Sequence, residues 1–165
     1  MTVRERALAG RRAFAPRARR YREVMEMRVA AYAVIVGDDD RVLLAHWNEG
    51  RKSAWTMPGG GLEAGEDPEH AVRREVREET GFRVRVDELL GIHSRVIPAH
   101  RRLTESESPL HTLRIVYRAS ITGGRLRHEK NGSTDRADWF TLEQVRGLQR
   151  VRLVDIALTM GGVIP

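Results

Sequence analysis

The sequence predicts an α/β (α+β) fold in which helices pack on a mixed β-sheet, and the order of its elements supports this, while its length and composition bound the domain and its chemistry. Strand-like and helix-like patterns follow one another in the order strands, helix, strands, helix, without the strict alternation of a purely parallel sheet. The chain has 165 residues, of which 41% are hydrophobic, so it can bury the core of one domain of ordinary size. It contains no cysteine, which excludes disulfide bonds, thiol catalysis and cysteine-bound zinc.

The first elements are predicted from apolar runs and from glycine and proline. A continuously apolar, β-branched run is typical of a buried strand, and a second run after a turn is typical of the strand that returns. A stretch with one proline and three glycines does not favour regular structure. The prediction is a strand at Val29–Val36, a turn at Gly37–Asp40, a strand at Arg41–Trp47, a polar loop at Asn48–Ser53 and an irregular segment at Trp55–Gly61.

A helix is predicted over Pro68–Thr80 because both of its ends carry recognisable signals. Asp67 is a residue type that caps helix N-termini, and Pro68 occupies the first helical position, where its missing N–H costs nothing. Gly81 falls where a residue in the left-handed conformation commonly ends a helix.

The C-terminal half is predicted from alternating patterns and one capping box. Thr141 with Gln144 three residues later forms a capping box that opens a helix. Ile97–Leu110 is a long polar loop, a kind of segment that is often functional in a compact domain. The other elements are strands at Phe82–Val86, Leu89–Val96, His111–Ser120 and Arg136–Phe140, a turn at Gly123–Gly124 that leads back through Leu126–Glu129, and a last helix at Val151–Met160.

The positive charge of the chain is concentrated at its N-terminus. The net charge is +6, but residues 1–27 hold eight arginines and three glutamates and account for +5 of it. The division is therefore a basic N-terminal extension at 1–27 and a nearly neutral domain at 28–165. A basic tail is more often a solvated arm than a specific reader of nucleic acid, so no nucleic-acid partner is expected.

The sequence does not predict a membrane protein. No uncharged apolar run approaches the roughly 20 residues that span a bilayer, and the N-terminus lacks the apolar region of a signal peptide. We therefore expect a cytoplasmic protein with no membrane partner, either as a monomer or as a homodimer whose second subunit packs on the extension.

Three carboxylates gather on one face of the predicted helix. Glu75, Glu78 and Glu79 are spaced i, i+3 and i+4, which places them together on an exposed face. Like charges at these spacings cost about 0.2–0.5 kcal/mol per pair, and the helix dipole disfavours anions in the last turn. Taken alone, such a cluster is either a solvated helix face or a site for Mg²⁺ or Mn²⁺, hard cations that prefer oxygen ligands.

The glycines before the helix favour the metal site, because Gly59, Gly60 and Gly61 let the backbone approach a ligand closely. Together with the helix they give the pattern Gly60-x5-Glu66-x7-Arg74-Glu75-Val76-x-Glu78-Glu79-x-Gly81-Phe82, which matches every defined position of the Nudix box. The chain therefore resembles the MutT-like Nudix hydrolases, over about residues 28–146. The resemblance implies an α/β/α sandwich around a mixed sheet, in which the box forms a loop, a helix and a loop.

The resemblance also implies the reaction and the roles of the box residues. Members of the family hydrolyse a nucleoside diphosphate linked to another group X, by attack of a metal-activated water on the pyrophosphate. The expected catalytic residues and Mg²⁺ ligands are Glu75, Glu78 and Glu79, joined as a ligand by the carbonyl of Gly59. Glu66 and Arg74 are expected to support the site by tying the loop to the helix.

The box leaves the general base open. Glu75 or Glu78 can serve, and an acidic residue on a later loop is the alternative. In this sequence the later candidates are Glu129 and Asp135.

Residues outside the box bear on the identity of the X group and on how the substrate is bound. Pro98 lies 16 residues beyond the end of the box, the position of a proline in relatives resembling ADP-ribose pyrophosphatases, and it favours an ADP-ribose-like substrate. Tyr32 and Trp47 are candidates for stacking on a base, and the alternative is that they belong to the core. Arg51 is a candidate phosphate clamp, and the alternative is plain surface charge.

Two other functions stay open. A Nudix module that binds and senses a nucleotide without hydrolysing it would keep the fold. A family member that has lost its catalytic activity usually lacks an acidic residue of the box, and none is missing here. An RNA 5′-end pyrophosphohydrolase would use the basic extension to hold the RNA.

Overall fold

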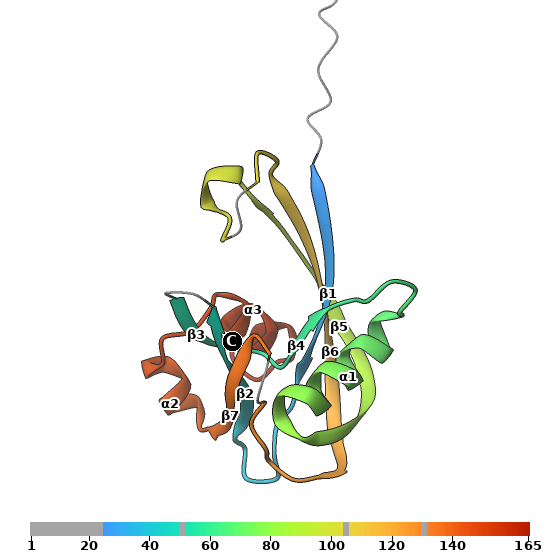
Figure 1. Ribbon diagram of the computed structural model, residues 1–165. Helices are drawn as coiled ribbons and strands as arrows, with labels where there is room; N and C mark the ends of the chain where they lie inside the picture. The colour runs from blue at the N-terminus through green and yellow to red at the C-terminus, as the bar shows by residue number, and fades with distance from the viewer. Residues whose placement is uncertain (1–24, 50–51, 104–105, 130–131) are drawn as a thin grey trace, which may run out of the picture.

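The computed structural model describes residues 25–49, 52–103, 106–129 and 132–165. These ranges hold seven strands, three helices and a short 3₁₀ helix, and their arrangement in space can be followed in Figure 1. The strands are β1 (Glu26–Val34), β2 (Val42–Glu49), β3 (Lys52–Thr56), β4 (Gly59–Gly61), β5 (Phe82–Ile97), β6 (Leu110–Gly124) and β7 (Thr134–Phe140). The helices are α1 (Pro68–Thr80), α2 (Leu142–Gly147) and α3 (Leu153–Met160), and the 3₁₀ helix is Ala99–Arg101.

The strands form two sheets. The larger has the order β4-β1-β6-β5 and is mixed, since β1 runs parallel to β6 while the β1–β4 and β5–β6 pairs are antiparallel. The smaller, β3-β2-β7, is antiparallel. This arrangement of helices with a mixed sheet confirms the predicted fold class.

Two apolar clusters hold the layers together. In one, Val72 and Val76 of α1 lie in the same buried cluster as Ala31 and Ala33 of β1. In the other, α3 contributes four buried side chains to a cluster with residues of β1, β2, β3 and β6. From Ala30 onward β1 therefore packs on both faces, as its continuous apolar run predicts, whereas its first three residues are exposed.

The predicted ends of α1 are confirmed. The Asp67 side chain accepts a hydrogen bond from the His70 N–H at 2.8 Å, and Pro68 is the first helical residue. Gly81 has φ 77° and its N–H donates to the Arg77 carbonyl at 3.0 Å. These local contacts set the orientation of the carboxylates that the helix carries.

The later helices differ little from the prediction. The capping box that opens α2 is present, with both of its hydrogen bonds. The last helix begins at Leu153, two residues after the predicted start. None of the helices in the described ranges is long and apolar enough to cross a membrane.

The prediction of an irregular segment at Trp55–Gly61 was wrong. Trp55 lies in β3, and Gly59–Gly61 forms β4, antiparallel to β1. Local propensity argued against a strand, but tertiary pairing requires glycine here. Gly59 has φ 136°, and a Cβ on it would overlap the carbonyl oxygen of Ala31.

Other boundaries also moved. The polar loop expected at Asn48–Ser53 is mostly strand, because β2 continues to Glu49 and β3 starts at Lys52. The two strands predicted at 82–86 and 89–96 are one strand, β5, whose register against β6 shifts three times. The long loop after it contains the 3₁₀ helix, and Leu126–Glu129 carries no strand. Residues 1–24 of the predicted basic extension lie outside the described residues.

Candidate active site

Helix α1 presents its three carboxylates to very different surroundings. The Glu78 side chain is 50% exposed and the Glu75 side chain 18%, whereas Glu79 is only 4% exposed. Glu79 faces the sheet, where its Oε2 accepts a hydrogen bond from the Gly59 N–H at 2.8 Å. The expectation that all three lie on an exposed face was wrong for Glu79, because β4 and β1 cover the inner edge of that face.

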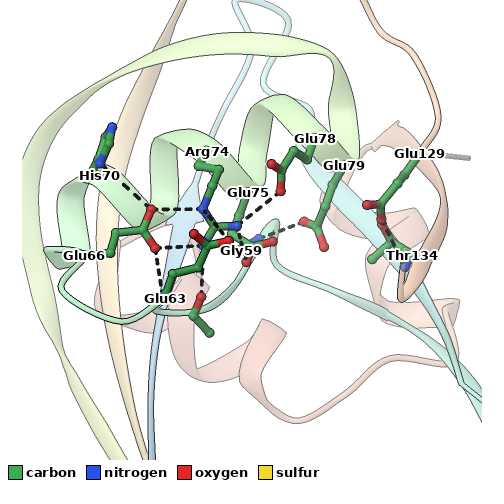
Figure 2. A network of polar contacts seen from close by, with 11 residues as sticks. Gly59, Glu63, Glu66, His70, Arg74, Glu75, Glu78, Glu79, Glu129 and Thr134 are labelled. Atoms are coloured by element: carbon green, nitrogen blue, oxygen red, sulfur yellow. Dashed lines mark hydrogen bonds and ion pairs between the residues drawn. The ribbon is translucent and has the colours of Figure 1, made fainter. Parts of the chain in front are cut away.

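Arg74 holds the loop and the carboxylates together (Figure 2). Its guanidinium binds Glu66 through two hydrogen bonds, Nε to Oε1 and Nη2 to Oε2, both at 2.9 Å. Nη2 also donates to the Gly61 carbonyl at 3.1 Å, while Nη1 donates to Glu75 at 3.0 Å and to Glu78 at 3.2 Å. One cation therefore links the glycine strand, the loop before α1 and two of the three acidic residues.

The buried carboxylates are costly to ionise. Burial raises the pKa of Glu79 well above its ordinary value, against the hydrogen bond from Gly59, and the neighbouring charges of Glu75, Glu129 and Glu78 raise it further. Burial also raises the pKa of Glu75, although Arg74 opposes the shift. Acidic groups in this state are stabilised by a proton or by a cation.

The donor chemistry fits a hard divalent cation. The groups that meet here are all oxygen donors, and Glu79 has only the Gly59 N–H as a recorded partner within the described residues. In that same part of the chain no three acidic or histidine side chains converge closely enough to enclose an ion. The reason is visible in the contacts, since Arg74 holds Glu75 and Glu78. A cation would compete with Arg74 for these two carboxylates.

The bare glycine strand makes room for Glu75. A Cβ on Gly60 would lie 2.5 Å from Glu75 Oε1, so a side chain at this position would displace the carboxylate. Gly60 is thus needed for the close approach of the Glu75 side chain of α1, whereas Gly59 is needed for the close approach of β1.

The two later acidic candidates lie in different surroundings. Glu129 accepts a hydrogen bond from the Thr134 hydroxyl at 2.6 Å, and its charge raises the pKa values of Glu75 and Glu79. Figure 2 shows it on the Glu79 side of the carboxylates. Asp135 is instead engaged by β2, with its oxygens 2.7 Å from His46 Nδ1 and 2.9 Å from Asn48 Nδ2.

The substrate-binding candidates are spread over the fold. Tyr32 is a half-buried residue of β1 that packs against a core cluster, and Trp47 is half-buried on β2. Arg51 lies outside the described residues. Arg28 and Arg114, which the sequence analysis did not single out, lie within electrostatic reach of the Tyr32 hydroxyl. Their signal in the sequence is an arginine next to the apolar residues of a predicted strand.

A separate cavity of about 380 Å³ lies at the C-terminal end of α1, and none of the three helix carboxylates lines it. It is bounded by Arg77, Gly81, Arg83, Gly124, Arg125 and Arg127. Cations at this end of a helix complement the helix dipole, which accounts for the position of Arg77.

Comparison with known proteins decides the family. The model of the NUDIX domain matches residues 26–158. The chain belongs to the Nudix family. It is 30% identical over 127 residues to an ADP-ribose pyrophosphatase of Methanocaldococcus jannaschii, an alignment covering 77% of this chain and 69% of the relative. It is 32% identical over 117 residues to a MutT-like protein of Streptomyces ambofaciens, with coverages of 71% and 66%.

Solved structures agree with this assignment. A Nudix hydrolase from Nitrosomonas europaea superposes with a TM-score of 0.69 at 26% identity, over 83% of this chain and 89% of that one. A MutT Nudix hydrolase from Burkholderia pseudomallei gives 0.62 at 27% identity, over 82% and 98%. The names of these relatives confirm the predicted class of Nudix pyrophosphohydrolase. The chain spans 32% of the length of a Caenorhabditis elegans Nudix hydrolase to which it is 37% identical.

The ion pair of Arg74 with Glu66 predicts how the free energy of unfolding depends on pH. Its hydrogen bonds lower the pKa of Glu66 from 4.5 to about 2 in the folded protein. Because the folded value is the lower one, this contribution to stability is complete above pH 4.5 and is lost as the pH falls towards 2. We expect the Glu66→Gln variant to lose less stability than the parent over that range, measured by urea unfolding at several pH values. Parallel pH profiles for the two proteins would contradict the assignment.

Proposed function

We propose that this protein hydrolyses the pyrophosphate linkage of a nucleoside diphosphate joined to a group X, with Mg²⁺ or Mn²⁺ as the cofactor. The observation that carries the proposal is the buried carboxylate of Glu79 beside Glu75. The fold keeps these two acidic groups together although burial and the neighbouring negative charges make their ionised forms unfavourable. Such an arrangement is typical of a site that functions with a bound cation.

Each acidic residue has a proposed role. Glu75 and Glu79 are the principal ligands, assisted by Glu78 and the Gly59 carbonyl. A cation bound there would neutralise charge on the pyrophosphate and lower the pKa of a water molecule. Glu75 and Glu78 are free to take up this role once they release Arg74, which keeps Glu66 as its bidentate partner.

Glu129 is the proposed general base. Its carboxylate acts on the same group of charges as Glu75 and Glu79, and Thr134 orients it through a hydrogen bond. Asp135 is the weaker choice, because His46 and Asn48 hold both of its oxygens and lower its pKa. A base with a lowered pKa accepts a proton less readily at neutral pH.

ADP-ribose is the proposed reference substrate. Pro98 at its distance from the box supports this choice, as does the 30% identity to a relative named an ADP-ribose pyrophosphatase. Tyr32 stands beside the charges of the site and is the aromatic residue proposed to contact the nucleotide.

The test is hydrolysis of a panel with Mg²⁺, Mn²⁺ or EDTA: ADP-ribose, other nucleoside diphosphate sugars, nucleoside triphosphates and 5′-triphosphorylated RNA. We expect phosphorus NMR to show cleavage within the pyrophosphate, activity at background in EDTA and recovery on adding Mg²⁺. Cleavage of RNA alone would favour the 5′-end pyrophosphohydrolase. Binding of a nucleotide without cleavage of any panel member would overturn the proposal in favour of a sensing module.

A further inference from the structure

Three adjacent strands of the larger sheet place basic side chains on one face. Arg28 of β1 and Arg95 of β5 both pair with Thr112 of β6, so they flank it from either side. Arg114 lies two residues further along β6 and pairs with His93 of β5. Because paired residues, and residues i and i+2 of a strand, point to the same side of a sheet, all four basic side chains share a face.

These arginines lack counter-charges. Within the described residues, the side chains of Arg28, Arg95 and Arg114 take part in no ion pair and no hydrogen bond, although arginine is the cation in most of the ion pairs found there. Arg114 is half-buried, and its burial together with the charges of Arg95 and Arg28 lowers its pKa. A half-buried, unpaired cation beside two exposed like charges destabilises the free protein, which indicates a place for an anion.

His93 gives an independent indication at the same place. Its Nδ1 is buried and has no hydrogen-bond partner. Burial and the charges of Arg114, Arg152 and Arg95 lower its pKa, so the ring is held neutral among cations. This unpartnered polar atom lies within reach of the charges of Arg114 and Arg95, so it adds to the unsatisfied polar groups on this face of the sheet.

The cluster borders the candidate active site. The position of a Cβ on Gly61 lies 3.4 Å from Arg28 Nε, and the Gly61 carbonyl is bound by Arg74. Burial raises the pKa of the Tyr32 hydroxyl, the charges of Arg28 and Arg114 oppose this shift and those of Glu79 and Glu75 add to it, so the hydroxyl is within reach of both sets of charges. In the strand order β4-β1-β6-β5, Arg28 lies on the strand next to the glycine strand β4, and Arg114 and Arg95 lie on the second and third strands from it.

We propose that Arg28, Arg95 and Arg114 form a phosphate subsite for the X group, so that the preferred substrates are nucleoside diphosphates whose X carries a further phosphate. This inference rests on the proposed function. Guanidinium groups bind phosphate through paired, charge-assisted hydrogen bonds, and three of them suit a dianion better than an uncharged sugar. The phosphate sits either on a sugar or at the end of a longer phosphate chain, and both place the same dianion on the arginines.

The experiment compares ligands that differ by one phosphate. Calorimetry in EDTA, where turnover is blocked, gives the Kd values of the full chain for ADP-ribose and for ADP-ribose 1″-phosphate. We expect the phosphorylated ligand to bind about 10- to 100-fold more tightly, the effect of one or two hydrogen bonds to a charged group. ATP is the second ligand in this comparison. If ATP binds more tightly than ADP-ribose while ADP-ribose 1″-phosphate does not, the subsite is assigned to a chain-terminal phosphate.

Variants locate the effect. Arg114→Gln and Arg95→Gln are expected to abolish the gain in affinity from the added phosphate and to leave the affinity for ADP-ribose within about twofold. Arg95 is exposed, so its replacement does not put folding at risk. Arg85→Gln is the matched control, since it removes an equal charge from β5 but from a residue paired with Asp87. It should leave the gain unchanged.

The outcomes separate the two proposals. Equal affinity for the two ADP-ribose ligands and no gain for ATP, or an equal loss in Arg95→Gln and Arg85→Gln, would overturn the subsite. Arginine-dependent binding without any hydrolysis when Mg²⁺ is added would keep the subsite and overturn the proposed function. Hydrolysis without a preference for the added phosphate would do the reverse.

Discussion

Replacing Glu79 with glutamine is expected to lower kcat by about three orders of magnitude or more, the scale on which a metal site stabilises a transition state. The glutamine carbonyl can still accept the hydrogen bond that Gly59 donates. The amide, however, is a poor ligand for a hard cation and carries no charge to hold one. The variant should therefore fold but bind Mg²⁺ weakly.

The same variant should be more stable without metal. Burial and three neighbouring carboxylates make the ionised Glu79 unfavourable, and a neutral side chain of the same shape removes that cost. We expect a higher Tm for Glu79→Gln than for the parent protein in EDTA, and no rise on adding Mg²⁺.

The matched control for this prediction is Glu69→Gln. Glu69 is on the same helix, is exposed and pairs with Arg73, so its loss should leave kcat near that of the parent. Activity of Glu79→Gln close to that of the parent would refute the metal-ligand assignment. A lower Tm in EDTA would refute the argument that this carboxylate is held at a cost.

Replacing Gly59 with alanine is expected to destabilise the protein by about 2–5 kcal/mol, the sum of overpacking and backbone strain. The added Cβ would overlap the Ala31 carbonyl and lie 2.7 Å from Tyr32 Cα, and both neighbours belong to the backbone of β1. Neither can move without shifting a central strand. The φ of 136° adds strain for any residue with a side chain.

Two other glycines separate these causes. Gly65 has φ 80° and nothing within 4 Å of its Cβ position, so Gly65→Ala should show strain alone, about 1 kcal/mol. Gly147 has open space and no positive φ, and Gly147→Ala should be close to neutral. Urea unfolding of the three variants gives the comparison. A loss for Gly59→Ala no larger than for Gly65→Ala would contradict the overlap with β1.

Activity should follow stability at this position. Gly59 donates its N–H to Glu79, so a displaced β4 strand also displaces the buried carboxylate. The residual folded fraction of Gly59→Ala is therefore expected to have a lower kcat than the parent under conditions where it remains folded.

What the sequence by itself determined is local. The ends of α1 follow from Asp67, Pro68 and Gly81, because caps depend on residues within one turn of the helix end. The spacing of the box carboxylates places them on one helix for the same reason. The capping box of α2 was likewise predictable, since both of its hydrogen bonds span three residues.

Only the tertiary structure decided what each of those residues meets. Gly59–Gly61 became a strand because β1 offers an unpaired edge, against the local preference of glycine. Glu79 is buried and Glu78 exposed, although they are neighbours in the chain, because the sheet covers only the inner side of α1. Pairing across the larger sheet likewise places Arg28 and Arg114, which are far apart in sequence, on one face. Burial and strand pairing depend on residues distant in the chain, so no local pattern contains them.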